Sequence, residues 1–233
     1  MSKRIYCYLM TAILACHCIS CSSLLLSKRG CDNFPQSYKV YQDYVKAGYT
    51  SITKNEYDNA IDNYNKAIKI SPFIPNHYYY RGLAWYKKGD KVKAIKDFSN
   101  AITLDPKQRS AYIYRGISRM EMGAYKEASS DYNQALALEP KDPIIQNNLS
   151  WLYANAVDKK FQDKGKALEH AKKAVELSNG GNAEILDTLA KAYYINGKVS
   201  EAVETEKKAI KLAPKNERLK AHLHEYEKGM MDN

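Results

Sequence analysis

The chain has 233 residues, 45% of them apolar and 27% charged, which is enough to bury a core as one elongated or two compact domains. Its formal net charge is +10, but beyond Arg29 the basic residues are interleaved with acids, as in KKFQDKGKALEHAKK. This mixture favours a solvated helix face and excludes a nucleic-acid surface, which needs clustered lysine and arginine. All five cysteines lie at or before Cys31, so the rest of the chain must be held together by packing alone.

The first residues have the form of a secretory signal. Lys3 and Arg4 are followed by residues 5–26, which carry no formal charge, and a basic start before an apolar run is typical of such signals. Residues 12–16 (AILAC) resemble the lipobox of bacterial lipoproteins, which implies cleavage before Cys16 and lipidation of its thiol. Two alternatives remain open: ordinary cleavage near Cys21 with secretion, and an uncleaved anchor, because a helix of this length can cross a bilayer.

Each of these alternatives places the body of the protein outside the cytosol of a bacterial host. We therefore expect a signal peptide or membrane anchor at residues 1–15 and a tether at 16–37. The cysteine-rich CHCISC sequence lies in this apolar run and not in a turn that could wrap around a metal, so no metal site is predicted there.

The body of the chain is a repeat. Pro72, Pro106 and Pro140 are evenly spaced along the sequence, and such self-similarity is the signature of stacked supersecondary units. Aligning the chain on this period gives five units and a final helix, with the fourth unit extended by an insertion after Tyr153. The predicted bounds are 38–74, 75–108, 109–142, 143–182 and 183–214 for the units, and 215–233 for the capping helix and tail.

Small residues recur at fixed places in these units. The first half of each unit carries one of Gly48, Gly82, Gly116, Ser150 and Ala190, and the second half carries one of Ala60, Ala94, Ala128, Ala167 and Ala202. Small side chains on both partners allow two antiparallel helices to approach closely. Between the halves, Gly89, Gly123, Gly197 and Asn55 supply the left-handed residue that ends a helix.

Bulky Tyr64, Phe98 and Tyr132 are expected to fill the space beside the small pairs. The pattern of period, small residues and aromatics resembles the tetratricopeptide repeat family over roughly residues 38–228. The resemblance implies an all-α fold, a right-handed α-solenoid of five antiparallel helix pairs with a C-terminal capping helix. Ala171 and Glu206 stand where that family has a large aromatic, so looser packing is expected in the last two units.

In a curved stack of this kind, the first helices line the inner face. Residues spaced by four and three on these helices form an apolar and aromatic stripe that we expect to bind a partner: Val45, Tyr49, Tyr79, Leu83, Tyr86, Ile113, Ile117, Met120, Asn147 and Trp151. The alternative is that several of them pack between adjacent helices. The family's mode of gripping a chaperone C-terminus needs lysine, asparagine and arginine, which are absent from Val45, Tyr49, Tyr80, Ser110 and Tyr114.

Two arginines and two aspartates also repeat. Arg81 is followed by Asp97, and Arg115 is followed by Asp131 at the same interval. Either these residues form structural pairs between helices, or the arginines reach an acidic ligand.

No catalytic constellation, cofactor motif or metal motif occurs in the sequence. His222 and His224 face different directions on a helix, and His77 and His170 are expected to be surface residues. We therefore expect no enzyme activity, no cofactor, no metal and no small-molecule substrate. The leading hypothesis is an envelope-tethered scaffold that binds a protein or an extended peptide, and the alternative is a structural subunit of an envelope assembly.

Overall fold

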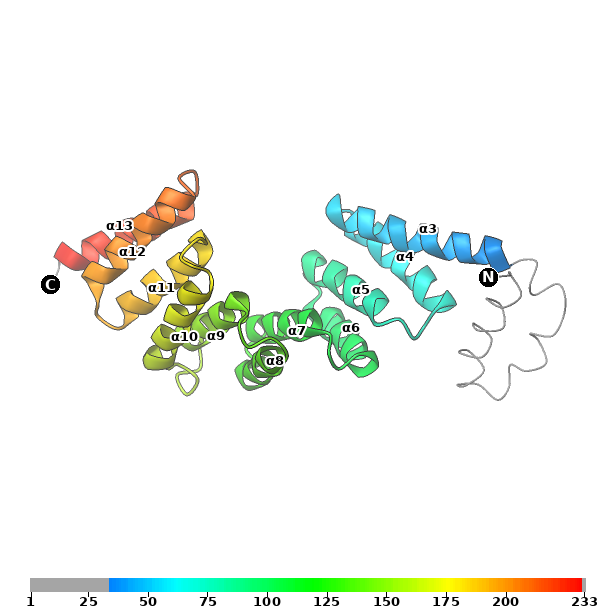
Figure 1. The fold of residues 1–233 in the computed structure, drawn as a ribbon, viewed down its shortest axis with the longest axis horizontal. Helices are drawn as coiled ribbons and strands as arrows, with labels where there is room; N and C mark the ends of the chain where they lie inside the picture. Colours follow the sequence, from blue (N-terminus) through cyan, green and yellow to red (C-terminus); the bar gives the residue numbers. More distant parts are fainter. Residues whose placement is uncertain (1–33, 232–233) are drawn as a thin grey trace. The chain divides into compact units, whose positions relative to one another are not determined.

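A computed structural model of the chain describes residues 34–231, and it is all helical, with no strand among these residues. The predicted signal or anchor, the lipidation residue Cys16 and most of the predicted tether lie outside the described residues. Figure 1 shows the helices α3 (Phe34–Thr53), α4 (Tyr57–Ile70), α5 (Pro75–Lys88), α6 (Lys91–Leu104), α7 (Arg109–Glu121), α8 (Tyr125–Leu138), α9 (Pro143–Asn155), α10 (Lys164–Leu177), α11 (Ala183–Ile195), α12 (Val199–Leu212) and α13 (Glu217–Met231).

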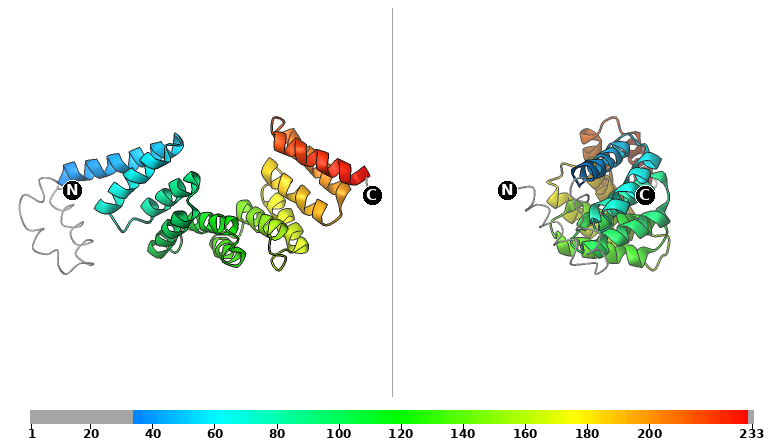
Figure 2. Two further views of the ribbon diagram at one scale, coloured as in Figure 1. Left: turned by 180° about the vertical axis from the view of Figure 1, so that it is seen from behind. Right: turned by 90° about the vertical axis from the view of Figure 1, so that its right-hand side faces the viewer.

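The helices fall into two compact units, one ending at Pro72 and one beginning at Phe73. In the first unit, α3 packs against α4, and α3 starts before residue 38, the predicted start of the first repeat. In the second unit, α5–α6, α7–α8, α9–α10 and α11–α12 are successive helix hairpins (Figures 1 and 2). Each hairpin packs against the first helix of the next, and α13 covers α12. The predicted all-α solenoid of helix pairs is confirmed.

The turns within hairpins have the predicted backbone conformation. Gly89 follows α5 with φ of 95°, in the left-handed region where a side chain is disfavoured. Asn55 has φ of 61° at the matching place between α3 and α4, and Gly123 and Gly197 also have positive φ. The longer connection predicted in the fourth unit consists of residues 156–163, between α9 and α10.

The glycines of the first helices make room for aromatic rings of the second helices. A Cβ atom added at Gly48 would lie 2.8 Å from the ring of Tyr64, and one at Gly82 would lie 2.9 Å from Phe98. At Gly116 the distance to the Tyr132 ring would be 2.7 Å. Carbon atoms in contact stay about 3.5–4.0 Å apart, so only glycine fits beneath these rings, which are fully buried. The sequence pattern predicted close approach through glycine–alanine pairs with the rings beside them; the alanines are buried as well, and the rings lie directly on the glycines.

The last two hairpins are packed differently because they lack the ring. Ser150 of α9 donates a hydrogen bond of 2.8 Å to the backbone oxygen of Ala167 on α10. Ala171 is fully buried and clusters with Leu189 of the next hairpin, so the looser packing expected at this position is not found. Beside Ala190 of α11, the space is taken by Tyr226 of α13, which is also buried.

The repeated arginines pair with the repeated aspartates inside each hairpin. Arg81 Nε and Nη2 each donate to a carboxylate oxygen of Asp97 at 2.7 Å. Arg115 Nη2 donates to Asp131 at 2.7 Å and its Nη1 donates to Ser99 of the preceding hairpin at 3.0 Å. Both aspartates are buried, so these arginines serve as structural pairs and do not wait for an acidic ligand.

Among the helices of residues 34–231, none is sufficiently long and apolar to cross a membrane.

We predict that Gly116→Ala destabilises the protein by about 1–3 kcal/mol, although alanine favours helices more than glycine, because the new methyl group overpacks the Tyr132 ring. Gly165→Ala is the matched control, since a Cβ there meets only Asp163 Oδ1, at 3.4 Å. It should be neutral or stabilising by up to about 1 kcal/mol. Urea unfolding followed by circular dichroism measures both, and equal effects at the two positions would refute the ring–glycine contact.

Candidate functional site

The candidate site is the surface of the second unit formed by α5, α7 and α9, which contact one another in that order. We call it the first-helix face and define it by the half-buried or exposed side chains that the sequence placed on its stripe. They are Tyr79, Leu83, Tyr86, Ile117, Met120, Asn147 and Trp151.

Three other predicted residues lie elsewhere. Ile113 is only 8% exposed and belongs to a core cluster with Tyr132 and Leu149, so it supports the face from beneath. Val45 and Tyr49 are on α3 of the first unit, where Val45 is half-buried and Tyr49 is exposed.

Tyr114 of α7 organises the aromatic part of the face. Its ring centroid lies 6.0 Å from that of Tyr79 and 6.0 Å from that of Tyr86, and it stacks on buried Phe98 at 5.9 Å. Burial, followed by the neighbouring tyrosines, raises the pKa of Tyr79 to about 12, so its hydroxyl is neutral at physiological pH. The rings of Tyr79, Tyr86, Phe98 and Tyr114 therefore form a cluster in which they hold one another in place, which we call the aromatic platform.

The hydroxyl of Tyr86 connects the aromatic platform to Glu121 at the end of α7. It donates a hydrogen bond of 2.8 Å to Glu121 Oε1, and Lys91 Nζ lies 3.0 Å from Glu121 Oε2. Burial and this hydrogen bond raise the pKa of Tyr86. The side chain of Tyr86 is thus fixed by both its ring and its hydroxyl.

A pocket opens on the face between α7 and α9. It is lined by Arg109, Ser110, Ile113, Tyr114, Ile117, Asp142, Ile144 and Asn148. Arg109 forms an ion pair with the buried Asp142, the N-cap residue of α9. On α9, Ile144 is 45% exposed and Trp151 is 47% exposed, so large apolar side chains remain accessible around a pocket with polar groups.

Two asparagines of α9 have unmet hydrogen-bonding capacity. Asn147 Oδ1 and Asn148 Nδ2 are both buried without a hydrogen-bond partner. A buried donor or acceptor that lacks a partner is costly, and an amide side chain offers both kinds of group. Of the two residues, Asn148 lines the pocket.

Sequence reasoning found part of this site. It named Trp151 and Ile117 from their spacing and noted that the stripe turns polar at Asn147 and Asn148, but it did not place Ile144, which the stripe of every fourth and third residue leaves out. The signal of Ile144 was its position on α9, one residue from Ile145.

The histidines correct one prediction. His77 is buried, at 2% exposure, and is therefore not a surface residue. His170 is half-buried, with its ring stacked on Tyr153 at a centroid distance of 5.6 Å and Nδ1 2.7 Å from Gln146 Oε1. Burial lowers the pKa of His170. His77 thus packs inside the fold, and His170 is partly enclosed beside Tyr153.

The comparison with protein families agrees with this geometry. Residues 75–108 and 110–142 each match the family described as "Tetratricopeptide repeat", and residues 48–89 match one described as "TPR repeat". The chain contains tetratricopeptide repeats. In addition, residues 163–232 match the family described as "Prolyl 4-hydroxylase peptide-substrate-binding domain".

Solved structures with this repeat fold align with most of the chain. A tetratricopeptide protein of Thermus thermophilus aligns with a TM-score of 0.65 at 20% identity, covering 80% of this chain and 98% of its own. MamA of Desulfovibrio magneticus aligns with a TM-score of 0.65 at 19% identity, covering 76% of this chain and 97% of its own. A tetratricopeptide repeat protein of Parabacteroides merdae aligns with a TM-score of 0.66 at 18% identity, covering 81% of this chain and 72% of its own. The search of curated proteins found no match. At these identities the likeness concerns the fold alone.

Proposed function

We propose that this tetratricopeptide repeat protein is a non-catalytic scaffold that binds an extended peptide segment of a partner protein on its first-helix face. The observation that carries the proposal is the pocket between α7 and α9, which combines polar with apolar side chains: Arg109, Ser110, Asp142 and Asn148 line it together with Ile113, Tyr114, Ile117 and Ile144. An extended peptide presents alternating side chains and free backbone amides, which match these two kinds of surface.

The exposed aromatic of the face supports a protein ligand. Trp151 lies on α9, the helix that also carries Asn147 and Asn148. Tryptophan, tyrosine and arginine dominate the binding energy of protein interfaces. The aromatic platform of α5 and α7 is held by contacts among its own rings, so its side chains lose little conformational freedom when a ligand binds.

The match of residues 163–232 to a peptide-substrate-binding domain also favours a peptide as the ligand class. This match covers α10 to α13, which follow the pocket along the chain. We propose that the peptide binds in the pocket between α7 and α9.

We further propose that the scaffold is tethered to a bacterial cell envelope by its N-terminal segment. The support is the sequence alone: Lys3 and Arg4, the charge-free residues 5–26 and the AILAC sequence ending at Cys16. Two or more acyl chains, at about 0.8 kcal/mol per buried methylene, give stable anchoring.

Selection from a displayed library of random peptides tests the binding proposal. Peptides enriched on the full chain should lose about 10- to 30-fold in affinity to Trp151→Ala, because truncating an interface anchor costs about 2 kcal/mol. Asn148→Ala should also weaken them, since it removes the amide donor. Affinities are measured by fluorescence anisotropy.

The matched control is Val92→Ala on α6, a second helix, where the side chain is 65% exposed. It should bind the selected peptides as the unchanged protein does. Peptides that bind Trp151→Ala and Asn148→Ala with undiminished affinity would show that the first-helix face is not the site.

The tethering proposal predicts the intact mass of the protein purified from its native membranes. The mass should equal that of a chain starting at Cys16 plus a diacylglyceryl group and any further acyl chain, and Cys16→Ser should abolish the lipid. An unmodified chain beginning at Met1, or one cut near Cys21, would contradict lipidation.

A further inference from the structure

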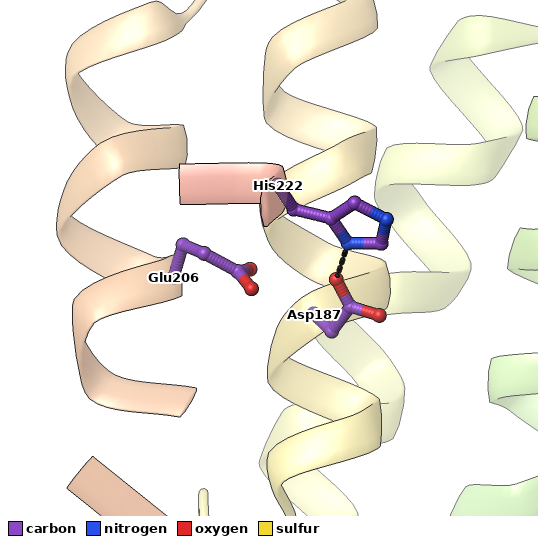
Figure 3. Close-up of side chains that lie close together, drawn as sticks. All are labelled: Asp187, Glu206 and His222. Atoms are coloured by element: carbon purple, nitrogen blue, oxygen red, sulfur yellow. Dashed lines mark hydrogen bonds and ion pairs between the residues drawn. The ribbon is translucent and has the colours of Figure 1, made fainter. Parts of the chain in front are cut away.

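Three polar side chains from three different helices meet in the last hairpin. Asp187 comes from α11, Glu206 from α12 and His222 from α13, and Figure 3 shows them facing one another. One potential ligand atom of each lies within 4.8 Å of those of the other two. Asp187 and Glu206 are buried, and His222 is half-buried.

The carboxylate of Glu206 is the group that points to a ligand. Its side chain is 0% exposed, and neither Oε1 nor Oε2 has a hydrogen-bond partner. Figure 3 shows it directed toward Asp187 and His222. Buried polar groups are normally hydrogen-bonded or coordinate metals, so a fully buried carboxyl group without a partner is free to accept a ligand.

The charged side chains around the trio pair with Asp187 but not with Glu206. His222 Nδ1 lies 2.6 Å from Asp187 Oδ1, while Arg218 Nη2 lies 3.3 Å from Asp187 Oδ2. Arg218 is also paired with Glu184, so its charge is shared with an acid outside the trio. Asp187 is thus compensated by Arg218 and His222, whereas the carboxyl group of Glu206 has no partner of its own.

A further unpartnered group adjoins the trio. The Tyr226 hydroxyl is buried without a partner, and its ring centroid lies 6.3 Å from that of His222. Such a hydroxyl can hydrogen-bond a water that completes a metal's coordination.

We propose that Asp187, Glu206 and His222 bind a divalent transition-metal ion of the Zn²⁺ type. Two carboxylate oxygens and one imidazole nitrogen are a ligand set suited to Zn²⁺, with metal–ligand distances of about 2.0–2.2 Å. The ion takes the place of the proton that His222 and Asp187 share, and Glu206 moves inward as the third ligand. Mg²⁺ is disfavoured because it prefers oxygen ligands only.

A metal at this position would join α11, α12 and the capping helix α13. The site is thus structural: it fixes the end of the repeat stack in place of the aromatic ring that Tyr64, Phe98 and Tyr132 supply in the first three hairpins. This inference is independent of peptide binding at α7 and α9.

Zn²⁺ titration of the full chain by calorimetry, with its five cysteines alkylated so that they do not compete, tests the proposal. The unchanged protein should bind one Zn²⁺ with micromolar or tighter affinity and bind Mg²⁺ far more weakly. Glu206→Gln and His222→Gln should each weaken Zn²⁺ binding by about 10-fold or more, since even outer-shell changes weaken metal sites that much.

Matched controls are available close to two of the ligands on the same helices. Glu204→Gln changes an exposed acid on α12, and His224→Gln changes an exposed histidine on α13. Both should bind Zn²⁺ as the unchanged protein does. Glu206→Gln should keep its fold, because the neutral amide relieves a buried carboxylate that has no partner, and circular dichroism checks this.

Hydrogen exchange locates the bound ion. Zn²⁺ should slow amide exchange in peptides from α11, α12 and α13, and Glu206→Gln should lose that effect. The proposal is overturned if the unchanged protein does not bind Zn²⁺, if Glu206→Gln and Glu204→Gln bind it equally, or if exchange slows only elsewhere in the chain.

Discussion

The fold depends on a contact between an aromatic ring on the second helix of a hairpin and a glycine on the first. Tyr64 lies over Gly48, Phe98 over Gly82 and Tyr132 over Gly116, each at a distance that a Cβ atom could not tolerate. The contact fixes both the separation of the two helices and their register along each other. The same pair occurs in the α5–α6 and α7–α8 hairpins, so these two hairpins present their first helices in the same way, and α5 and α7 contact each other on one face.

The last hairpin shows what replaces this contact. Where the ring would be, α12 carries the buried Glu206, and the facing residue on α11 is Ala190. Tyr226 of the capping helix α13 supplies an aromatic ring there, and its ring centroid lies 4.7 Å from that of Tyr194 on α11. The substitution thus exchanges an apolar contact within the hairpin for a polar group that needs a partner from α11 and α13. The metal ion that we propose would meet that need and join the capping helix to the last hairpin.

The repeat period, the small residues and the turn residues were sufficient to predict the hairpins, because each of these signals is local. Gly89 and Asn55 show positive φ as expected, and Arg81 and Arg115 pair with the acids that recur in step with them. The exposure of the stripe was harder to predict, since Ile113 is buried by a neighbouring hairpin. The Asp187, Glu206 and His222 cluster could not be read from sequence at all. Its members come from three helices and have no motif spacing, and His222 was considered only with His224.

The account rests on coupling between ring and glycine, and a double-mutant cycle on Gly116 and Tyr132 measures that coupling most directly. Unfolding free energies are determined in urea for the unchanged protein, the two single variants Gly116→Ala and Tyr132→Leu, and the double variant. The account predicts that Gly116→Ala is destabilising beside tyrosine but neutral or stabilising beside leucine, since the ring that it would strike is gone. If the effects of the two substitutions simply add, the ring and the glycine are independent, and another interaction sets the spacing of the helices.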